Sequence, residues 1–227
     1  MISKRTFLTT LAGGVASAAL LSNTGIAKAE RVFDPGVGGW VEVKRNGRRS
    51  PPAKYNRRSV RIKTSLAANT VIIDTDKKFL YHYHGNGKAT RYGVGVGREG
   101  FEWQGNASIR RKAEWPTWTP PAEMRIRERK KGIILPASMK GGIDNPLGAR
   151  AMYLYKGGRD TLYRIHGTNQ PWTIGQNMSS GCIRMVNKDV EHLYKNVKIG
   201  TKVKVLTGNT SKVYTEQRGL LSIFAGG

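Results

Sequence analysis

Short strand-like segments separated by glycine-containing turns are the feature that most limits what this chain can fold into. Residues 79–84 alternate in the manner of a strand and are followed by the turn Gly85-Asn86-Gly87. Residues 91–96 give a second segment, which carries two glycines. With 28 glycines among 227 residues, the chain has many turn positions and no room for long helical repeats. Successive hairpins of this kind predict an antiparallel or mixed β-sheet.

The other regular patterns are equally short. Further strands are predicted at residues 71–73, 149–155, 161–166 and 202–206. A helix is predicted over residues 187–197, with Asn187 as N-cap and apolar side chains at the i, i+3, i+4, i+7 spacing of one helix face. Those side chains are Val190, Leu193, Tyr194 and Val197. Residues 100–132 hold three of the five tryptophans and are predicted to be an irregular excursion over the sheet.

The N-terminus has the pattern of an export signal. A basic pair, Lys4 and Arg5, precedes an apolar stretch over residues 7–21, and Ala27-Lys28-Ala29 provides a small-x-small cleavage site. Residues 1–29 are therefore predicted to be a signal peptide, which leads the mature chain into an oxidising compartment. The alternative is a short buried N-terminal helix. No apolar run reaches the roughly 20 residues of a membrane span, so none is predicted in the mature chain.

Basic residues dominate the charge of the chain. Lys and Arg number 39 against 15 Asp and Glu, and the formal charge of +24 becomes +21 without residues 1–29. Residues 30–65 lack apolar periodicity and are predicted to form an extended, mostly solvated arm, either a plain linker or a polyanion-binding segment. Residues 66–207 are predicted to form the folded domain, and residues 208–227 a loosely attached tail.

One cysteine and one histidine suggest nucleophilic chemistry. Cys182 is the only cysteine, which excludes an intramolecular disulfide and a cysteine-cluster zinc site. His166 lies sixteen residues earlier, at the end of a predicted strand, where an imidazole could take the thiol proton. A nearby imidazolium would also raise the thiolate fraction. Because no Asp or Glu lies between Asp160 and Asp189, the Gly167 carbonyl is the nearest group that could orient the imidazole.

Each residue of this pair also has a simpler interpretation. Taken alone, Cys182 is ordinary as a small buried hydrophobe. Taken alone, His166 is ordinary as a hydrogen-bonded core or edge histidine. Composition and spacing therefore leave both a structural and a catalytic role open.

The motifs around the pair resemble one family. His166-Gly167-Thr168, together with Ser179-Ser180-Gly181-Cys182-Ile183-Arg184-Met185, resembles the signature of the L,D-transpeptidase catalytic domain. Segments 91–97, 145–148 and 189–194 fit the same family, and 114–121 resembles the excursion of one proteobacterial branch. The resemblance covers roughly residues 67–207. Ser180 stands where many members have histidine, which removes one oxyanion or substrate contact.

This resemblance implies a fold and an activity. The fold would be mainly β, a mixed β-sandwich or barrel-like domain with one or two short helices. Members are exported enzymes of the periplasm or cell wall that form 3→3 crosslinks between peptidoglycan stem peptides, or exchange their terminal D-Ala, through a cysteine thioester. In this chain Cys182 would be the nucleophile, and His166, held by the Gly167 carbonyl, the base. Gly181 and Cys182 amides would bind the oxyanion, beside Ser180; no metal or cofactor is implied.

Several further side chains are secondary candidates. In an extended chain Arg184 would point to the same side as Cys182, where its fork suits a substrate carboxylate; the alternative is an internal pair with Asp189 or a carbonyl. Three tryptophans are candidates either for substrate contact or for packing: Trp115, Trp118 and Trp172. The other histidines are expected to form no metal site, and His192 is expected to face solvent; they are His82, His84 and His192.

Other functions stay open at this stage. A hydrolase or a lipoprotein-attaching enzyme on the same fold would differ only in the acceptor. A cell-wall cysteine peptidase has its Cys before its His, and a sortase has its His much further upstream, so the order and spacing here disfavour both. A non-catalytic basic protein would bind polyanions of the anionic cell envelope, as the charge allows. No motif indicates a specific nucleic-acid partner.

Overall fold

The computed structural model describes residues 30–34, 39–43, 50–97, 104–130, 132–179, 181–208 and 213–217, with side chains from residue 50 onward except at 178 and 179. The predicted signal peptide lies outside them. In chain order the elements are β1 Glu30–Asp34, β2 Gly39–Val43, η1 Ala53–Tyr55, β3 Arg58–Thr64, β4 Val71–Asp74, β5 Phe79–Gly85, β6 Lys88–Gly93, β7 Val96–Gly97, β8 Gly105–Glu114, α1 Ala122–Arg129, β9 Arg150–Lys156, β10 Arg159–His166, η2 Pro171–Thr173, β11 Asn177–Ser179, β12 Ile183–Arg184, α2 Asn187–Asn196, β13 Lys202–Leu206 and β14 Tyr214–Gln217.

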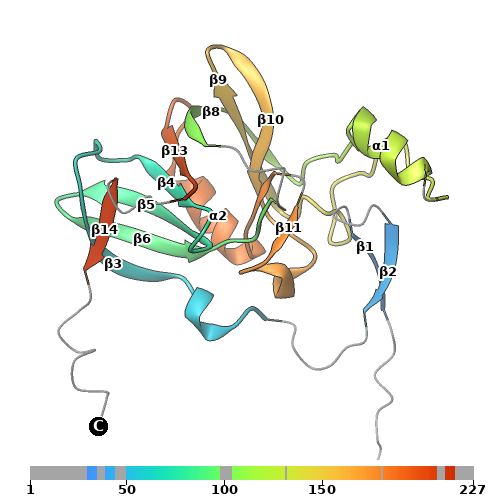
Figure 1. The fold of residues 1–227 in the computed structure, drawn as a ribbon, viewed down its shortest axis with the longest axis horizontal. Helices are drawn as coiled ribbons and strands as arrows, with labels where there is room; N and C mark the ends of the chain where they lie inside the picture. The colour runs from blue at the N-terminus through green and yellow to red at the C-terminus, as the bar shows by residue number, and fades with distance from the viewer. Residues whose placement is uncertain are drawn as a thin grey trace, which may run out of the picture.

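A ten-stranded mixed sheet forms most of the molecule (Figure 1). Its order is β12-β10-β9-β8-β13-β4-β5-β6-β3-β14, in which β10–β12 and β13–β4 are parallel pairs and the others are antiparallel. Two smaller sheets pair β1 with β2 and β11 with β7. The prediction of a mainly β, mixed fold with one or two short helices is confirmed. No helix among the described residues is long and apolar enough to cross a membrane.

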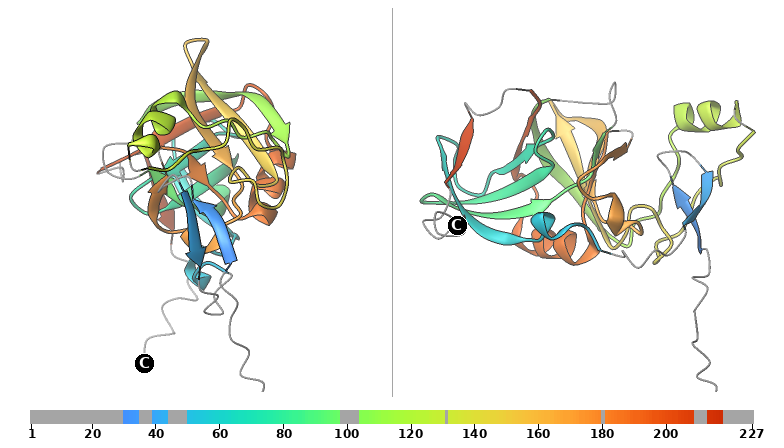
Figure 2. Two further views of the ribbon diagram at one scale, coloured as in Figure 1. Left: turned by 90° about the vertical axis from the view of Figure 1, so that its right-hand side faces the viewer. Right: turned by 60° about the horizontal axis from the view of Figure 1, so that its bottom comes forward.

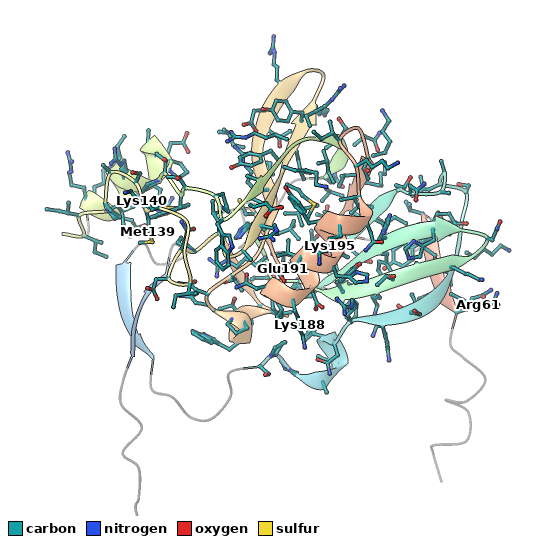
Figure 3. The ribbon with its side chains drawn as sticks, turned by 180° about the vertical axis from the view of Figure 1, so that it is seen from behind. Arg61, Met139, Lys140, Lys188, Glu191 and Lys195 are labelled. Atoms are coloured by element: carbon teal, nitrogen blue, oxygen red, sulfur yellow. The ribbon has the colours of Figure 1, made fainter. Side chains whose placement is uncertain are left out.

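The central strand β4 is buried on both faces. Val71 and Ile73 belong to the main core, whereas Ile72 belongs to a second core on the opposite face. A strand covered on both sides reads as a continuous apolar run, which is why residues 71–73 do not alternate. The main core is closed by α2, whose Val190 and Leu193 are fully buried. On the outer face of this helix lie Lys188, Glu191 and Lys195 (Figure 3).

The sheet curls back on itself at its far edge. Strand β14 lies at the end of the strand order, yet the hydroxyl of Tyr214 donates to Asp74 Oδ2 at 2.8 Å in β4. The rings of Tyr214 and Tyr81 are 4.8 Å apart between centroids. Contacts across several strands of one sheet require strong curvature, so this half is barrel-like, as expected.

Part of the predicted basic arm is a strand of this sheet. Residues 58–64 form β3, which pairs with β6 on one side and with β14 on the other. Ile62 is 2% exposed and Tyr55 is also buried, so the arm is not mostly solvated over these residues. The arginines and the lysine of β3 are exposed, whereas Val60 and Ile62 face the second core, and the basic composition hides this alternation. The predicted loose tail likewise contains β14, whereas residues 220–224 lie outside the described part.

The excursion predicted at residues 100–132 contains a ten-residue strand. Strand β8 pairs with β9 and β13 near the middle of the sheet. A register shift between Ile109 and Arg111 breaks its alternation, so the sequence there does not read as a strand. The irregular part is a lobe over residues 115–148 that carries α1 and stands apart from the sheet (Figure 2). Its own small core joins Trp118, Met124 and Leu135.

Candidate active site

The parallel pair β10–β12 brings the predicted histidine and cysteine to neighbouring strands. Ile165 is paired with Ile183, so His166 ends β10 directly beside β12, and Cys182 immediately precedes β12. The amide of Met185 donates to the His166 carbonyl at 2.8 Å, which fixes this register. His166 is paired with Arg184, so the chain returns beside it after eighteen residues, and Cys182 lies two residues before that partner.

The ring of His166 is held by the backbone. Only 3% of the residue is exposed, and Nδ1 lies 2.5 Å from the carbonyl oxygen of Gly167. A carbonyl only accepts, so Nδ1 is the protonated nitrogen and Nε2 keeps a free lone pair. The imidazole is thereby set in the tautomer that a base requires, while its catalytic role remains a prediction.

The side chain of Asn187 holds the backbone that follows this histidine. Its Oδ1 accepts from the amide of Ala149 at 3.0 Å and from that of Thr168 at 3.2 Å. A Cβ on either Gly148 or Gly167 would collide with the same oxygen. The helix α2 begins at Asn187, but this side chain makes no capping bond to the helix, so the predicted N-cap role is wrong. Its side-chain oxygen instead accepts hydrogen bonds from amides at the ends of β9 and β10.

The turn before Cys182 depends on a glycine. Gly181 has φ 104°, in the region that side-chain-bearing residues rarely adopt, and it is buried. Cys182 itself is partly exposed. Ser180, which was predicted to lie near the substrate, is outside the described residues. The Gly181 and Cys182 amides therefore remain oxyanion candidates on the grounds of the turn alone.

The imidazole and the thiol are both neutral in the resting protein. Burial lowers the pKa of His166 to about 3, with the nearby positive charge of Arg184 acting in the same direction. Burial also raises the pKa of the Cys182 thiol, against a hydrogen bond from the Arg164 backbone and the charges of Arg164 and Arg184. Burial therefore disfavours the expected imidazolium beside the sulfur, because a buried ring loses much of the hydration that stabilises its charged form.

Arg184 is enclosed behind the site. It is 2% exposed, and its Nη1 lies 3.5 Å from Oε1 of Gln170. Its backbone exchanges two hydrogen bonds with Gly95, at 3.0 and 2.8 Å. Asp189, one of the alternative partners predicted for Arg184, has its Oδ1 3.3 Å from Nη1 of Arg57. A substrate contact by Arg184 remains a prediction.

The tryptophans and the other histidines divide between packing and surface. Trp118 is 6% exposed in the core of the lobe, whereas Trp115 is 43% exposed and Trp172 is half-buried. His192 is not free in solvent, because its Nδ1 lies 2.8 Å from the hydroxyl of Tyr92. His82 is buried, and neither of its ring nitrogens has a hydrogen-bond partner among the described residues. Within the described ranges, no three His, Cys, Asp or Glu side chains are placed to hold a metal ion.

Sequence reasoning missed the amides that hold the site together. Asn145 is 1% exposed, and its Nδ2 donates to the carbonyls of Pro116, Met139 and Lys140 at 3.1, 3.0 and 2.9 Å. Asn145 and Asn187 connect the lobe, β9 and β10 through long-range backbone contacts. In the sequence, Asn145 stood out only as part of the family-like segment 145–148, and Asn187 only as a predicted N-cap.

Residues 68–205 match the YkuD family, described as the L,D-transpeptidase catalytic domain. This match takes in more than half of the chain and encloses β4 to β12, α2 and most of β13. The chain belongs to the YkuD family of L,D-transpeptidase catalytic domains. His166, Gly167, Gly181 and Cys182 all lie within the matched segment of this L,D-transpeptidase-family chain. The resemblance predicted from the motifs is confirmed.

The relatives of this YkuD-family chain include longer proteins. The probable L,D-transpeptidase ErfK/SrfK of Escherichia coli is 38% identical over 139 residues, which cover 60% of this chain and 43% of the relative. The probable L,D-transpeptidase YcfS of the same organism is 38% identical over 154 residues, covering 66% and 47%. The chain therefore spans less than half the length of these curated relatives.

One match among the solved structures extends over nearly the whole length of the solved chain. It is a Brucella melitensis protein described as a probable carnitine operon oxidoreductase, 47% identical over 68% of this chain and 96% of that one. Its TM-score is 0.45. That description applies to the Brucella protein and is not carried over to this chain.

Proposed function

We propose that this protein is an L,D-transpeptidase that acts on the tetrapeptide stems of peptidoglycan through Cys182. The observation that carries the proposal is the placement of His166. Its Nδ1 lies 2.5 Å from the Gly167 carbonyl oxygen. Its strand β10 runs beside β12, which Cys182 directly precedes, and both strands lie within the segment that matches the family. A thiol, an imidazole in a fixed tautomer and a glycine turn are the parts that acyl transfer needs.

The first half-reaction forms a thioester. The Cys182 sulfur attacks the carbonyl carbon of the third stem residue while its proton passes to Nε2 of His166. The tetrahedral oxyanion is received by the backbone amides of Gly181 and Cys182. Its collapse breaks the amide bond to the terminal D-Ala, whose nitrogen takes the proton from His166 as it leaves.

The second half-reaction returns the thiol. An amine of a neighbouring stem attacks the thioester carbonyl and gives its proton to His166. The carbon–sulfur bond then breaks, the sulfur takes the proton back, and a 3→3 crosslink results. If free D-Ala is the amine, the same steps exchange the terminal residue.

The resting charge state suits this sequence of proton transfers. With the pKa of His166 lowered to about 3 and that of Cys182 raised, proton transfer accompanies attack instead of preceding it. A lowered pKa keeps the Nε2 lone pair free but makes the ring a weaker base, so transfer of the proton has to be coupled to attack by the sulfur. A free thiolate would be more exposed to oxidation in an exported protein, so a neutral thiol also protects the nucleophile.

The surroundings of the reaction follow from the same proposal. The substrate lies in the bacterial cell wall, so the protein would work in the periplasm or at the wall after export by residues 1–29. The net charge of +21 without that segment favours residence near anionic envelope polymers. Stem peptides are the proposed partners, and none of the proposed steps calls for a cofactor.

Mass spectrometry of muropeptides tests the function directly. Purified sacculi rich in tetrapeptides are incubated with the mature protein and with Cys182→Ala as matched control. The expected result is a new 3→3 dimer, or incorporation of labelled D-Ala, with the parent protein only. Unchanged sacculi from a folded, reduced protein would rule out transpeptidation. Release of D-Ala without a dimer or exchange would identify water as the acceptor, and thus a hydrolase on this fold.

A further inference from the structure

Strand β10 carries a bulge a few residues before His166. Its register with β9 shifts between Asp160 and Arg164. Within the bulge Leu162 has φ 63° and is 72% exposed. A bulky residue in the left-handed region is a backbone outlier, and bulges next to active sites commonly redirect a side chain.

Local hydrogen bonds hold this bulge in shape. Oδ1 of Asp160 accepts from the amide of Leu162 at 2.9 Å. The Thr161 hydroxyl donates to the carbonyl of Leu154 at 2.6 Å and accepts from the amide of Tyr163 at 3.2 Å. The bulge is therefore a defined turn, and its effect is to bring Arg164 back over Asp160.

The guanidinium of Arg164 is held from three directions. It forms a two-pronged ion pair with Asp160, Nη1 to Oδ1 at 2.7 Å and Nη2 to Oδ2 at 2.9 Å. It lies 4.4 Å from the ring centroid of Tyr153 on the neighbouring strand. Its Nη1 also donates to the Tyr163 carbonyl at 3.0 Å. The side chain is 16% exposed, so this cation is poorly screened by water.

The strand pairing brings the backbone of Arg164 next to the nucleophile. The parallel register of Ile165 with Ile183 places Arg164 and Cys182 at the preceding positions of adjacent strands. The Arg164 backbone hydrogen-bonds to the Cys182 thiol, and both this bond and the Arg164 charge favour the thiolate. The Asp160 carboxylate acts on the thiol in the opposite direction.

We propose that Arg164, and not His166, supplies the main positive charge that stabilises the Cys182 sulfur as it loses its proton, with Tyr153 and Asp160 holding its guanidinium in place. The inference rests on the proposed function in taking Cys182 as the nucleophile. Arg164 acts through the cysteine and so is a positioning residue. The charged and titratable groups that act on the thiol are Asp160, Tyr163 and Arg164 of β10 and Arg184 of β12, and His166 ends β10 two residues beyond Arg164.

His166 does not compete for this role in the resting protein. Its lowered pKa leaves it uncharged at neutral pH, so it can accept the proton but cannot stabilise the thiolate beforehand. Arg184 contributes a second, weaker positive charge from its enclosed position. In this arrangement His166 accepts the proton, while Arg164 stabilises the thiolate that is left behind.

The test measures the rate at which iodoacetamide alkylates Cys182 as a function of pH, by intact mass, on the folded mature protein. An adjacent opposite charge shifts a pKa by about 1 or more, so Arg164→Gln should raise the thiol pKa and slow alkylation at pH 7 roughly tenfold. The rate at high pH should stay that of the parent. Arg164→Lys keeps the charge and should lie within about threefold of the parent at pH 7.

Two further variants separate charge from structure. Asp160→Asn removes a negative charge while Tyr153 still holds the arginine, so alkylation at pH 7 should become several-fold faster, opposite to Arg164→Gln. Arg111→Gln is the matched control, because Arg111 also stacks on Tyr153, at 4.5 Å, and is not among the groups acting on the thiol. It should behave like the parent.

The outcomes decide the proposal without any peptidoglycan substrate. A parent-like thiol pKa in Arg164→Gln, or shifts in the same direction in Arg164→Gln and Asp160→Asn, would overturn it. If Arg164→Gln does not fold, Asp160→Asn decides alone: a thiol pKa that rises or does not move contradicts the assignment. Failure of the muropeptide test with these alkylation results intact would reject the acyl-transfer function but leave the Arg164 effect standing.

Discussion

The two ends of the ten-stranded sheet differ in the residues and interactions that hold them together. At one end, β9, β10 and β12 carry the site, where glycines, a bulge and enclosed polar side chains set the geometry. At the other, β6, β3 and β14 are joined by tyrosines and ion pairs around the second core. Parts of this second end, β3 and β14, lie outside the family segment 68–205.

The far end is closed by one acidic residue in β14. Glu216 accepts from Nη1 of Arg91 at 2.8 Å and from the hydroxyl of Tyr81 at 2.8 Å. The Arg91 guanidinium also lies 4.1 Å from the ring centroid of Phe79. Removing one partner of an enclosed ion pair leaves a charge without compensation, so this end is sensitive to single substitutions.

The site end of the sheet supplies the groups for the reaction, whereas the far end contributes mainly to stability. Burial of His166 and Arg184 costs hydration free energy that packing elsewhere must offset. The second core supplies apolar burial with no polar group needed for the reaction. Substitutions at the site end should therefore change rate more than stability, and those at the far end the reverse.

The largest expected effect is the loss of the base at the site end. His166→Ala should slow acylation of Cys182 by roughly 10²- to 10⁴-fold, because it removes the proposed base. The rate is measured with a β-lactam of the carbapenem class, or a stem peptide, by intact mass. His84→Ala is the matched control, since His84 is exposed and bonded to Thr90, and it should stay within a fewfold of the parent. An equal loss in both variants would contradict the assignment of the base.

A glycine substitution should separate position from chemistry. In Gly167→Ala the new Cβ meets Oδ1 of Asn187 and lies 3.0 Å from the Ala149 amide nitrogen, so the His166 loop must shift. A displacement of about 1 Å costs on the order of 10²-fold in rate. Gly142→Ala is the control, because nothing lies within 4 Å of its Cβ. Parent-like activity in Gly167→Ala would show that the loop tolerates movement.

The far end should respond in stability and not in rate. Glu216→Gln leaves Arg91 enclosed without its anion and should lower the free energy of unfolding by about 2 kcal/mol, or Tm by roughly 4–8 °C. The ratio kcat/KM should stay within about twofold. Glu191→Gln on the outer face of α2 is the control for loss of a carboxylate and should leave Tm unchanged (Figure 3). A large fall in activity with unchanged Tm would erase the distinction between the two ends.

The smallest expected effect is a pH dependence of the stability of the folded protein, to which the buried His82 and His166 both contribute. Burial lowers the pKa of His82 to about 4 and that of His166 to about 3, from 6.5. The unfolded chain then binds more protons than the folded one below pH 6.5, so stability is full above that pH and falls as pH drops toward 4. His82→Leu should reduce the fall in Tm between pH 7 and 5 by about 4 °C.

Scanning calorimetry at the two pH values measures this difference. The control is His84→Leu, which removes a more exposed ring and should keep most of the parent's pH dependence. If His82→Leu and the parent lose the same Tm on acidification, the buried ring of His82 is not a source of it.

Local patterns were enough to locate many of the elements. The segments predicted at 79–84, 149–155, 161–166, 187–197 and 202–206 match β5, β9, β10, α2 and β13 to within one or two residues. Alternation and helical spacing are properties of neighbouring residues, so they survive in the sequence. They failed for β8, where a bulge disturbs the period, and for β3, where arginines and lysines mask the inward-facing Val60 and Ile62.

The sequence alone determined the family, the mainly β class and the identity of the candidate pair, because His166-Gly167-Thr168 and Gly181-Cys182 sit in motifs with fixed local spacing. Tertiary structure decided what surrounds that pair. The neutral charge state of His166 comes from burial, the Asn187 contacts come from a helix meeting two strands, and the parallel pairing of β10 with β12 brings the backbones of Arg164 and Cys182 together. Burial and cross-strand distance depend on residues far apart in the chain, and no local pattern records them.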